Sequence, residues 1–202
     1  MVSQHYYSAD PETGHRLKEL EVTLRGQSLR LYTDKGVFSR QQVDFGTRLL
    51  ADHAQLPDQG AIVDVGCGYG PIGLAVAKES PHRDVTLLDI NRRAVELARK
   101  NAQLNGLTNV TILESDGLEA VSGQLFDAIL SNPPIRAGKK VVYALFEQSY
   151  TSLKSHGSLW IVIQKKQGAP SALKKLEELF SSVETVIRKK GYHVIRAQKG
   201  TP

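Results

Sequence analysis

Two hydrophobic patterns alternate along the chain from residue 61 to its end. Short apolar runs predict β-strands, and apolar residues that recur every three or four positions predict helices. The expected strands are 61–65, 85–90, 110–113, 126–130, 158–163, 183–188 and 192–197, and the expected helices are 71–79, 92–105, 140–153 and 170–180. Pro71 suits the first turn of a helix, and Asn105-Gly106 suits the end of one.

This alternation of strands and helices predicts parallel strands joined by right-handed crossovers, with helices on both faces of the sheet. The last two strands are separated only by a short turn at Gly191, so no crossover helix fits and one of them must run antiparallel. The pattern therefore predicts an α/β fold with an open, mostly parallel sheet that ends in an antiparallel hairpin.

The first sixty residues follow another pattern. Apolar and polar residues alternate over 21–24 and 29–32, on either side of Arg25-Gly26-Gln27, which predicts a β-hairpin. A loop over 33–39 and a helix over 43–54 are expected to follow.

Length and composition predict a single folded domain. With 202 residues, of which 41% are hydrophobic and 23% charged, the chain is close to the average of soluble globular proteins. The first sixty residues hold too few apolar side chains for a core of their own. We therefore expect residues 1–55 to pack as an N-terminal extension on a core of residues 56–202.

The composition favours a cytoplasmic protein without a metal ion. Apolar runs such as 159–163 are much shorter than the ~20 residues of a membrane helix, and the N-terminal segment lacks the apolar stretch of a secretion signal. The single cysteine, Cys67, cannot form an internal disulfide, and the histidines show no ligand spacing. The oligomeric state stays open.

Positive charge is concentrated in the last third of the chain. Residues 1–60 and 61–134 carry formal net charges of −1 and −3, whereas residues 135–202 carry +9. A basic surface of this kind attracts polyanions, and nucleic acid is the first candidate. The alternative is a solvated lysine surface that only keeps the protein soluble.

A glycine-rich segment, DVGCGYGPIG at residues 64–73, leaves a predicted strand and enters a predicted helix. Ligands of such sheets bind at the carboxyl ends of the strands, where glycines allow a close approach to the backbone. Gly68, Gly70 and Gly73 match the spacing of the dinucleotide-binding fingerprint, which on its own is a weak signal.

Two residues of this segment favour a cationic ligand over a diphosphate. Pro71 removes one amide from the helix N-terminus, where a pyrophosphate would need donors. Asp64 would repel a diphosphate and would suit a cation. S-adenosyl-L-methionine carries a sulfonium and an ammonium group, so we expect it to bind here. The expected contacts are Asp64 and the backbone of Gly66, Gly68 and Gly70.

Further acidic residues follow the next two strands. Asp89 ends the second strand and could accept hydrogen bonds from a ribose diol, while Ile90 could lie on an adenine face. Asp116 and Gly117 follow the third strand, in a loop whose carboxylate could accept from the adenine amino group. For each acid the alternative is a helix cap or turn residue.

The fourth strand ends in Ser131-Asn132-Pro133-Pro134-Ile135, where two prolines stiffen the backbone. The Asn132 side-chain oxygen and the Pro133 carbonyl can both accept from one planar NH₂ group. Two acceptors favour pyramidal geometry at the nitrogen and direct its lone pair toward a methyl donor. We therefore expect both residues to be catalytic; the alternative is an ordinary turn.

These motifs together resemble a known family. The segments DVGCGYGPIGL (64–74), SDGL (115–118) and SNPP (131–134), with Asp89, are similar to the ordered motifs of class I S-adenosylmethionine-dependent methyltransferases that act on amino groups. The segment TDKGVFSRQQVDFGTRLL (33–50) resembles the opening of the small methyltransferase domain of ribosomal RNA small subunit methyltransferase C, a guanine-N2 methyltransferase family.

The resemblance implies a Rossmann-like, doubly wound sheet of seven strands with an antiparallel C-terminal hairpin. It implies that Asn132 and Pro133 grip the target amine. It assigns cofactor contacts to Gly66, Gly68, Asp89 and Asp116. It also places Phe38, Asp44 and Phe45 near the cofactor or the substrate.

The sequence departs from the family pattern in two respects. Ile135 stands where the family usually has an aromatic residue that stacks on the target base, so stacking would have to come from elsewhere, such as Phe38. The rRNA enzymes carry two tandem domains of this type, whereas this chain has room for one. The target nucleotide is therefore not carried over.

The sequence as a whole predicts methylation of a guanine N2 amine in ribosomal RNA or a ribosomal subunit. The residues expected on the substrate side are Phe38, Pro134, Ile135, Arg136, Lys139 and Lys140. Other amine targets remain open, namely adenine N6 or a protein glutamine. A nicotinamide-dependent reductase and a binding module without turnover are further alternatives.

Overall fold

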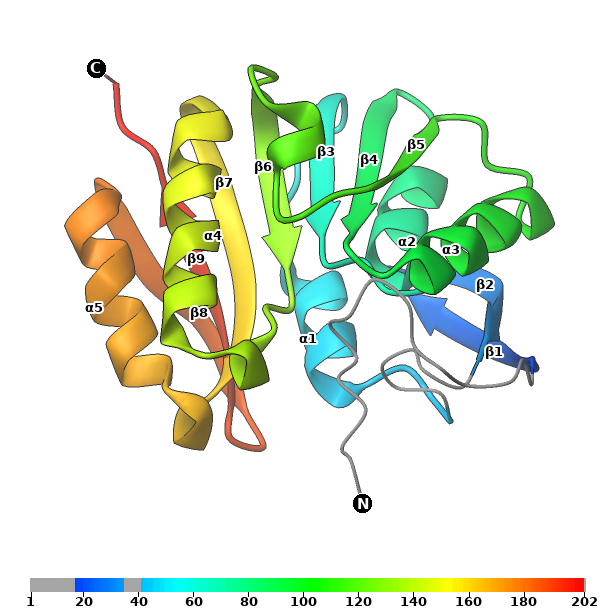
Figure 1. Cartoon of the computed structure of the whole chain (residues 1–202), viewed down its shortest axis with the longest axis horizontal. Coiled ribbons are helices and arrows are strands. Elements are labelled where there is room, and N and C mark those ends of the chain that lie inside the picture. The colour runs from blue at the N-terminus through cyan, green and yellow to red at the C-terminus, as the bar shows by residue number, and fades with distance from the viewer. Residues whose placement is uncertain (1–16, 35–40, 202) are drawn as a thin grey trace.

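The computed structural model describes residues 17–34 and 41–201 (Figure 1). A two-stranded sheet and a seven-stranded sheet are present. The strands are β1 (Lys18–Leu24), β2 (Gln27–Thr33), β3 (Gly60–Val65), β4 (Arg83–Asp89), β5 (Val110–Glu114), β6 (Phe126–Ser131), β7 (Leu153–Gln164), β8 (Ser182–Lys189) and β9 (Tyr192–Gln198). The helices are α1 (Phe45–His53), α2 (Pro71–Glu79), α3 (Arg92–Leu104), α4 (Lys139–Ser152) and α5 (Ala169–Leu179), with 3₁₀ turns η1 (Glu119–Val121), η2 (Ile135–Ala137) and η3 (Lys165–Gln167).

The order of strands in the large sheet creates a switch point beside β3. The order is β5-β4-β3-β6-β7-β9-β8, and β9 alone runs opposite to the other six strands of this sheet. From β3 the chain builds β4 and β5 on one side, then returns to build β6 on the other. Open α/β sheets bind ligands in the crevice that such a reversal leaves at the carboxyl ends of the strands.

Helices cover both faces of the sheet because side chains alternate along each strand. In β3, Ile62 belongs to the core shared with α1, α2 and α3, whereas the next residue, Val63, belongs to the core shared with α4 and α5. Both side chains are fully buried, as expected for a central strand covered on two sides. The predicted Rossmann-like fold, with its seven strands and antiparallel C-terminal hairpin, is confirmed.

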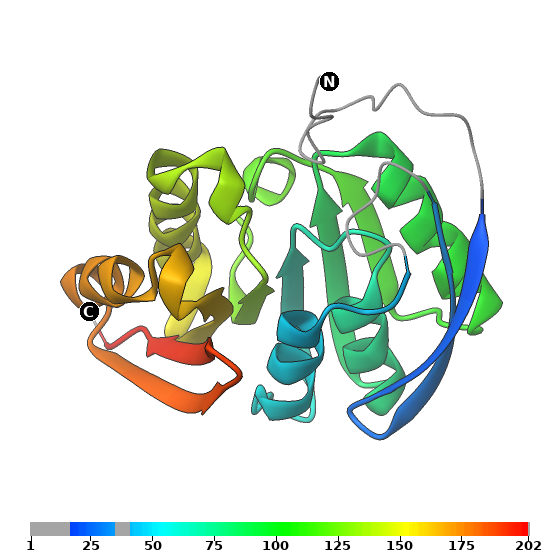
Figure 2. The ribbon, with the colours of Figure 1, turned by 90° about the horizontal axis from the view of Figure 1, so that it is seen from below.

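The N-terminal hairpin packs against α3 at the edge of the molecule (Figure 2). Its apolar side chains, including Leu24 and Leu31, belong to the same buried cluster as α2 and α3. The side chain of Asn101 in α3 accepts from the Tyr32 amide at 2.6 Å and donates to the Tyr32 carbonyl at 2.9 Å. The Asn101 side chain also donates to the Tyr69 carbonyl, in the glycine-rich segment, at 2.8 Å.

Most element boundaries differ from the expected ones by one or two residues, and in three places the structure shows a larger or a specific change. Arg25 and Gly26 both adopt positive φ, 52° and 71°, so a two-residue turn closes the hairpin and the strands extend to Leu24 and Gln27. Helix α1 starts at Phe45 because the Asp44 side chain caps it. Strand β7 starts at Leu153 rather than 158, with a register shift opposite β6.

Within the described ranges, no helix is long and apolar enough to span a membrane. The described part of the chain also holds no cluster of three or more His, Cys, Asp or Glu side chains that could bind a metal ion.

We expect Asn101→Leu to destabilise the protein by about 2–4 kcal/mol, because it leaves three buried backbone groups without their partner. Urea unfolding measures this change. The matched control is Gln103→Leu, at an exposed position two residues along the same helix, which should change the free energy of unfolding by less than about 0.5 kcal/mol. Equal effects of the two substitutions would contradict the clamping role of Asn101.

Candidate active site

A cavity of about 1040 Å³ opens at the carboxyl ends of β3, β4, β5 and β6, beside the switch point. This volume lies at the upper end of the range typical of small-molecule sites. The cavity brings together most of the residues predicted from the sequence. Those that line it are Asp64, Gly66, Gly68, Asp89, Ile90, Asp116, Gly117, Asn132, Pro133, Pro134, Ile135, Arg136 and Lys140.

Four residues predicted at or near the site are not among the lining residues, and Phe45, the first residue of α1, is one of them. Gly70 caps α2 with φ of 96°, and a Cβ there would lie 2.9 Å from the Leu74 side chain, so it serves the turn into the helix rather than the cavity. Lys139 is exposed at the first residue of α4 and does not line the cavity. Phe38 lies outside the described residues.

The glycine-rich loop bends so that its backbone faces the cavity. The amides of Gly66 and Cys67 both donate to the Leu88 carbonyl, at 2.8 and 2.9 Å. Gly66 and Gly68 have φ of 73° and 58°, and a Cβ on either would meet no atom within 4 Å. Both glycines therefore leave open space on the cavity side, which forms a cradle that a ligand can enter.

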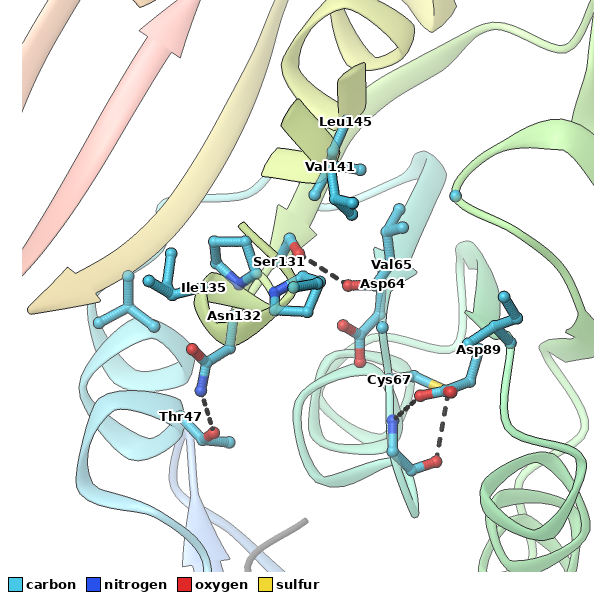
Figure 3. A pocket seen from close by; sticks show the side chains of 18 of the residues that line it. Thr47, Asp64, Val65, Cys67, Asp89, Ser131, Asn132, Ile135, Val141 and Leu145 are labelled. Carbon is cyan, nitrogen blue, oxygen red and sulfur yellow. Dashed lines mark hydrogen bonds between the residues drawn. The ribbon is translucent and has the colours of Figure 1, made fainter. Parts of the chain in front are cut away.

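Asp89 holds this loop in shape (Figure 3). One oxygen of its carboxylate accepts from the Gly68 amide at 2.7 Å, and the other accepts from the Asn91 amide at 2.9 Å. Burial raises the pKa of Asp89, and these amides oppose that rise. Each carboxylate oxygen keeps a second lone pair, so Asp89 can still accept hydrogen bonds from ligand hydroxyl groups.

Asp64 is a nearly buried carboxylate on the cavity wall, 1% exposed. Its Oδ2 accepts from the Gly73 amide at 2.9 Å, the one hydrogen bond to this carboxylate within the described residues. Burial raises the pKa of Asp64 to about 7, and the nearby Asp89 adds to the rise. A buried anion with a single donor is well suited to receive a cation.

The loop after β5 packs against a side chain of helix α4 at the cavity. Gly117 has φ of 55°, and the Gln148 side chain of α4 occupies the place that a Cβ on Gly117 would need. The side-chain oxygen of Gln148, Oε1, accepts from the Leu118 amide at 3.1 Å and thereby fixes the loop. Asp116 is exposed at the edge of the cavity, where its carboxylate is available to a ligand.

The proline-rich motif forms a tight turn at the end of β6. Pro134 has φ of −75° and ψ of 74°, the values of an inverse γ-turn, and the Ile135 amide donates to the Pro133 carbonyl at 2.8 Å. This bond uses one lone pair of the Pro133 oxygen and leaves one for a substrate. Ser131 anchors the end of the strand by donating from its hydroxyl to the Val65 carbonyl at 2.8 Å.

The Asn132 side chain is held by helix α1. Its Nδ2 donates to the Thr47 hydroxyl at 3.0 Å, and the amide oxygen points away from Thr47 (Figure 3). In the same view the Asp64 carboxylate lies between Asn132 and Asp89, as the strand order β6-β3-β4 requires. The cavity therefore carries an acceptor at one strand end, the buried Asp64 at the next and the partly buried Asp89 at the one after.

This arrangement fits S-adenosylmethionine. The two glycine cradles admit a ligand close to the backbone, and Asp64 offers a negative charge to its cationic end. Asp89 offers acceptors to its ribose hydroxyl groups. Cys67 is buried, and burial raises the pKa of its thiol well above the usual value, so the thiol is unsuited to act as a nucleophile.

Several lining residues were not predicted from the sequence. They include Val43, Thr47, Gln148, Gln164, Gln167 and Tyr192. Thr47 lies within the segment that carries the family resemblance, so that segment offered an indirect signal. Tyr192 and Gln148 come from β9 and α4, and no motif marks them. The folded chain alone brings these positions to the cavity.

A cavity of this kind, at the switch point of a Rossmann-like sheet, defines a nucleotide-cofactor enzyme domain. The chain belongs to the methyltransferase small domain family, whose sequence model matches residues 28–196. The predicted methyltransferase class, and with it S-adenosyl-L-methionine as the cofactor, is confirmed. The alternative of a nicotinamide-dependent reductase does not agree with this family.

Similar proteins include several that modify ribosomal RNA. The chain is 54% identical to the uncharacterized protein YbxB of Bacillus subtilis over 98% of this chain and all of that protein. It is 35% identical to ribosomal RNA large subunit methyltransferase G of Ectopseudomonas mendocina, over 85% of this chain and 47% of that enzyme. It is 32% identical to ribosomal RNA small subunit methyltransferase C of Pseudomonas entomophila, over 91% of this chain and 55% of that enzyme.

A solved structure shows the same fold. The 16S rRNA N2 G1207 methyltransferase RsmC of T. thermophilus, in complex with AdoMet and guanosine, superimposes with a TM-score of 0.82 at 25% identity. It is matched over 95% of this chain and 52% of that chain. The chain thus spans the whole of YbxB but about half the length of the rRNA methyltransferases that it matches.

The raised pKa of Asp64 predicts a pH-dependent stability. Below about pH 7 the folded protein keeps Asp64 neutral, whereas the unfolded chain releases its proton near pH 4. This group therefore lowers the free energy of unfolding as the pH rises from about 4 to about 7, by up to about 4 kcal/mol. We expect Asp64→Asn to gain stability relative to the wild type between pH 5 and pH 8, measured by urea unfolding.

The matched control for this measurement is Asp84→Asn, at an exposed position in β4. Its stability difference from the wild type should stay constant between pH 5 and pH 8. If Asp64→Asn also gave a constant difference, the raised pKa of Asp64 would be wrong.

Proposed function

We propose that the protein transfers a methyl group from S-adenosylmethionine to the exocyclic N2 amine of a guanine in ribosomal RNA. The main support is a rigid pair of acceptors on the cavity wall, the Asn132 side-chain oxygen and the Pro133 carbonyl oxygen. The proposal assigns to them the two N–H groups of the target amine.

The cofactor would lie across the strand ends between the glycine loop and the proline turn. We assign its ammonium group to Asp64, its ribose hydroxyl groups to Asp89, and its methionine end to the backbone of Gly66 and Gly68. Ile90 would pack on the adenine, and Asp116 and Gly117 would border its amino group. When bound, the cofactor supplies an electrophilic methyl group on a sulfonium sulfur.

Asn132 and Pro133 would act on the nucleophile. The lone pair of an exocyclic amine is delocalised into the ring, which makes the nitrogen a poor nucleophile. Two acceptors on the N–H groups favour pyramidal geometry and fix the direction of the lone pair. Neither group is a base, which suits a nitrogen that becomes acidic only after it has gained the methyl group. Positioning and electrostatics would then supply most of the catalysis.

Exposed cationic residues on or close in sequence to the segments that line the cavity support a nucleic acid substrate. We call them the basic rim: Arg136, Lys139, Lys140, Lys165, Lys166, Arg188, Lys189 and Lys190. The Lys165 amide donates to the Gly191 carbonyl at 2.8 Å, which joins η3 to the β8–β9 turn. All members of the rim are exposed, and none forms an ion pair with another described residue.

An uncompensated cationic rim beside a cavity attracts a phosphate backbone. The pKa of His193 lies below its usual value, chiefly because of burial. The positive charges of Arg188 and Lys165, two members of the rim, lower this pKa further. A paired and stacked guanine cannot reach the cavity, so the target base would be turned out of its RNA helix. Tyr192 lines the cavity and would offer the aromatic face that Ile135 lacks.

The relatives support guanine and ribosomal RNA over other amines. Two of the similar enzymes are named for ribosomal RNA, and the RsmC structure holds guanosine. A ribosomal substrate agrees with the expected cytoplasmic location. The direct test is incorporation of labelled methyl groups into undermethylated rRNA and ribosomal subunits, followed by mass analysis of the nucleosides. Labelled N6-methyladenosine, or label in ribosomal protein, would favour the alternative amine targets.

Removal of the Asn132 acceptor should stop methyl transfer. We expect Asn132→Ala to lower kcat at least about 10²–10³-fold, because one of the two acceptors for the amine is lost. The dissociation constant for S-adenosylmethionine, measured by titration calorimetry, should stay within about twofold, since Asn132 is assigned to the substrate. A fully active variant would remove the proposed role of Asn132.

Reversal of charge on the rim should reduce the salt dependence of RNA binding. We expect Lys140→Glu and Lys166→Glu each to lower the slope of log K against log salt concentration by about 1. The control is Lys174→Glu, an equal charge change at an exposed position of α5 outside the rim, which should leave the slope nearly unchanged. Equal slopes for all three variants would place RNA binding elsewhere.

A further inference from the structure

The proposed role of Asn132 requires one particular orientation of its amide group. The amide has an acceptor, Oδ1, on one side and a donor, Nδ2, on the other. A half turn about the last side-chain bond exchanges the two with little change in shape. In the wrong orientation the NH₂ group of Asn132 would face the N–H groups of the target amine, donor against donor. Catalysis therefore needs the Asn132 side chain to be held with its oxygen toward the substrate.

Thr47 holds the Nδ2 side of this amide. The Asn132 Nδ2 donates to its Oγ1 at 3.0 Å, and the Asn132 oxygen points the other way (Figure 3). Thr47 itself is buried, with 6% of its surface exposed. A threonine in a helix populates two χ1 states rather than three, which limits the places that its hydroxyl can occupy.

The start of helix α1 is fixed in turn. The Asp44 carboxylate caps the helix by accepting from the Gly46 amide at 2.9 Å and from the Thr47 amide at 3.2 Å. On its other side Gly46 packs against Tyr192 of β9, so closely that a Cβ on Gly46 would lie 2.7 Å from a ring carbon. The Phe45 ring packs against the same Tyr192 ring, with 5.5 Å between the ring centroids. The helix start is thus held between its own cap and the large sheet.

We propose that Thr47 is a positioning residue that anchors the Nδ2 side of the Asn132 amide and so holds the oxygen toward the substrate amine. The inference rests on the proposed function of Asn132. It also gives α1 a function, because the helix then completes the active site at a residue 85 positions before Asn132 in the sequence.

Kinetics of two variants test the proposal. Thr47→Val keeps the branched shape and removes the hydroxyl, and we expect it to lower kcat about 10- to 50-fold. The KM for RNA and the dissociation constant for S-adenosylmethionine should each stay within about twofold, as should the fraction of folded protein at the assay temperature. Thr47→Ser keeps the hydroxyl and should restore at least half of the wild-type kcat. A wild-type kcat in Thr47→Val would overturn the proposal.

A spectroscopic measurement tests the hydrogen bond without any turnover. The side-chain NH₂ resonances of Asn132 can be assigned by their absence in Asn132→Asp. We expect Thr47→Val to shift these resonances and to speed their exchange with solvent, and Thr47→Ser to leave both nearly unchanged. Unaltered resonances in Thr47→Val would overturn the proposal. If the resonances respond but no guanine is methylated, the proposed function fails while the role of Thr47 stands.

Discussion

The pairing of β3 with β6 places Asp64 and Asn132 at the same edge of the sheet, although 68 positions of sequence separate them. The chain leaves these two strands toward opposite sides, so no crossover covers the space above them. Every feature of the site depends on this opening. Asp89 and the glycine loop line it from the β4 side, and the proline turn lines it from the β6 side. Without the reversal of strand order, the same residues would stand on separate surfaces.

Electrostatics divide the cavity into two parts of different character. Toward β3 and β4 the cavity holds the carboxylates of Asp64 and Asp89, and burial raises the pKa of both. At the proline turn it presents neutral oxygen acceptors, and beyond them the exposed cations of the basic rim. A cationic small molecule fits the first part and a polyanion fits the rim, with a neutral amine between them. The family membership and the proposed RNA substrate are both consistent with this division.

The sequence predicted the fold closely because the hydrophobic patterns of strands and helices were regular and because glycine, asparagine and proline marked the turns and helix ends. It predicted Asp64, Asp89 and Asn132 because each stands in a local motif at a strand end. It could not predict Thr47, Gln148 or Tyr192, which reach the cavity only through tertiary packing. Gly70 belongs to the same motif as Gly66 and Gly68 but faces Leu74, since a periodic glycine pattern does not distinguish a cradle from a helix cap.

The Asn101 side chain links two segments that are distant in the sequence, the Tyr32 backbone of the N-terminal hairpin and the Tyr69 carbonyl of the glycine loop. Detachment of the hairpin removes two of the three contacts that orient this amide. Fraying of the N-terminal hairpin is therefore expected to affect the glycine loop that lines the cavity. Local unfolding and ligand affinity become linked quantities, and a ligand that rigidifies the loop also stabilises strands that it never touches.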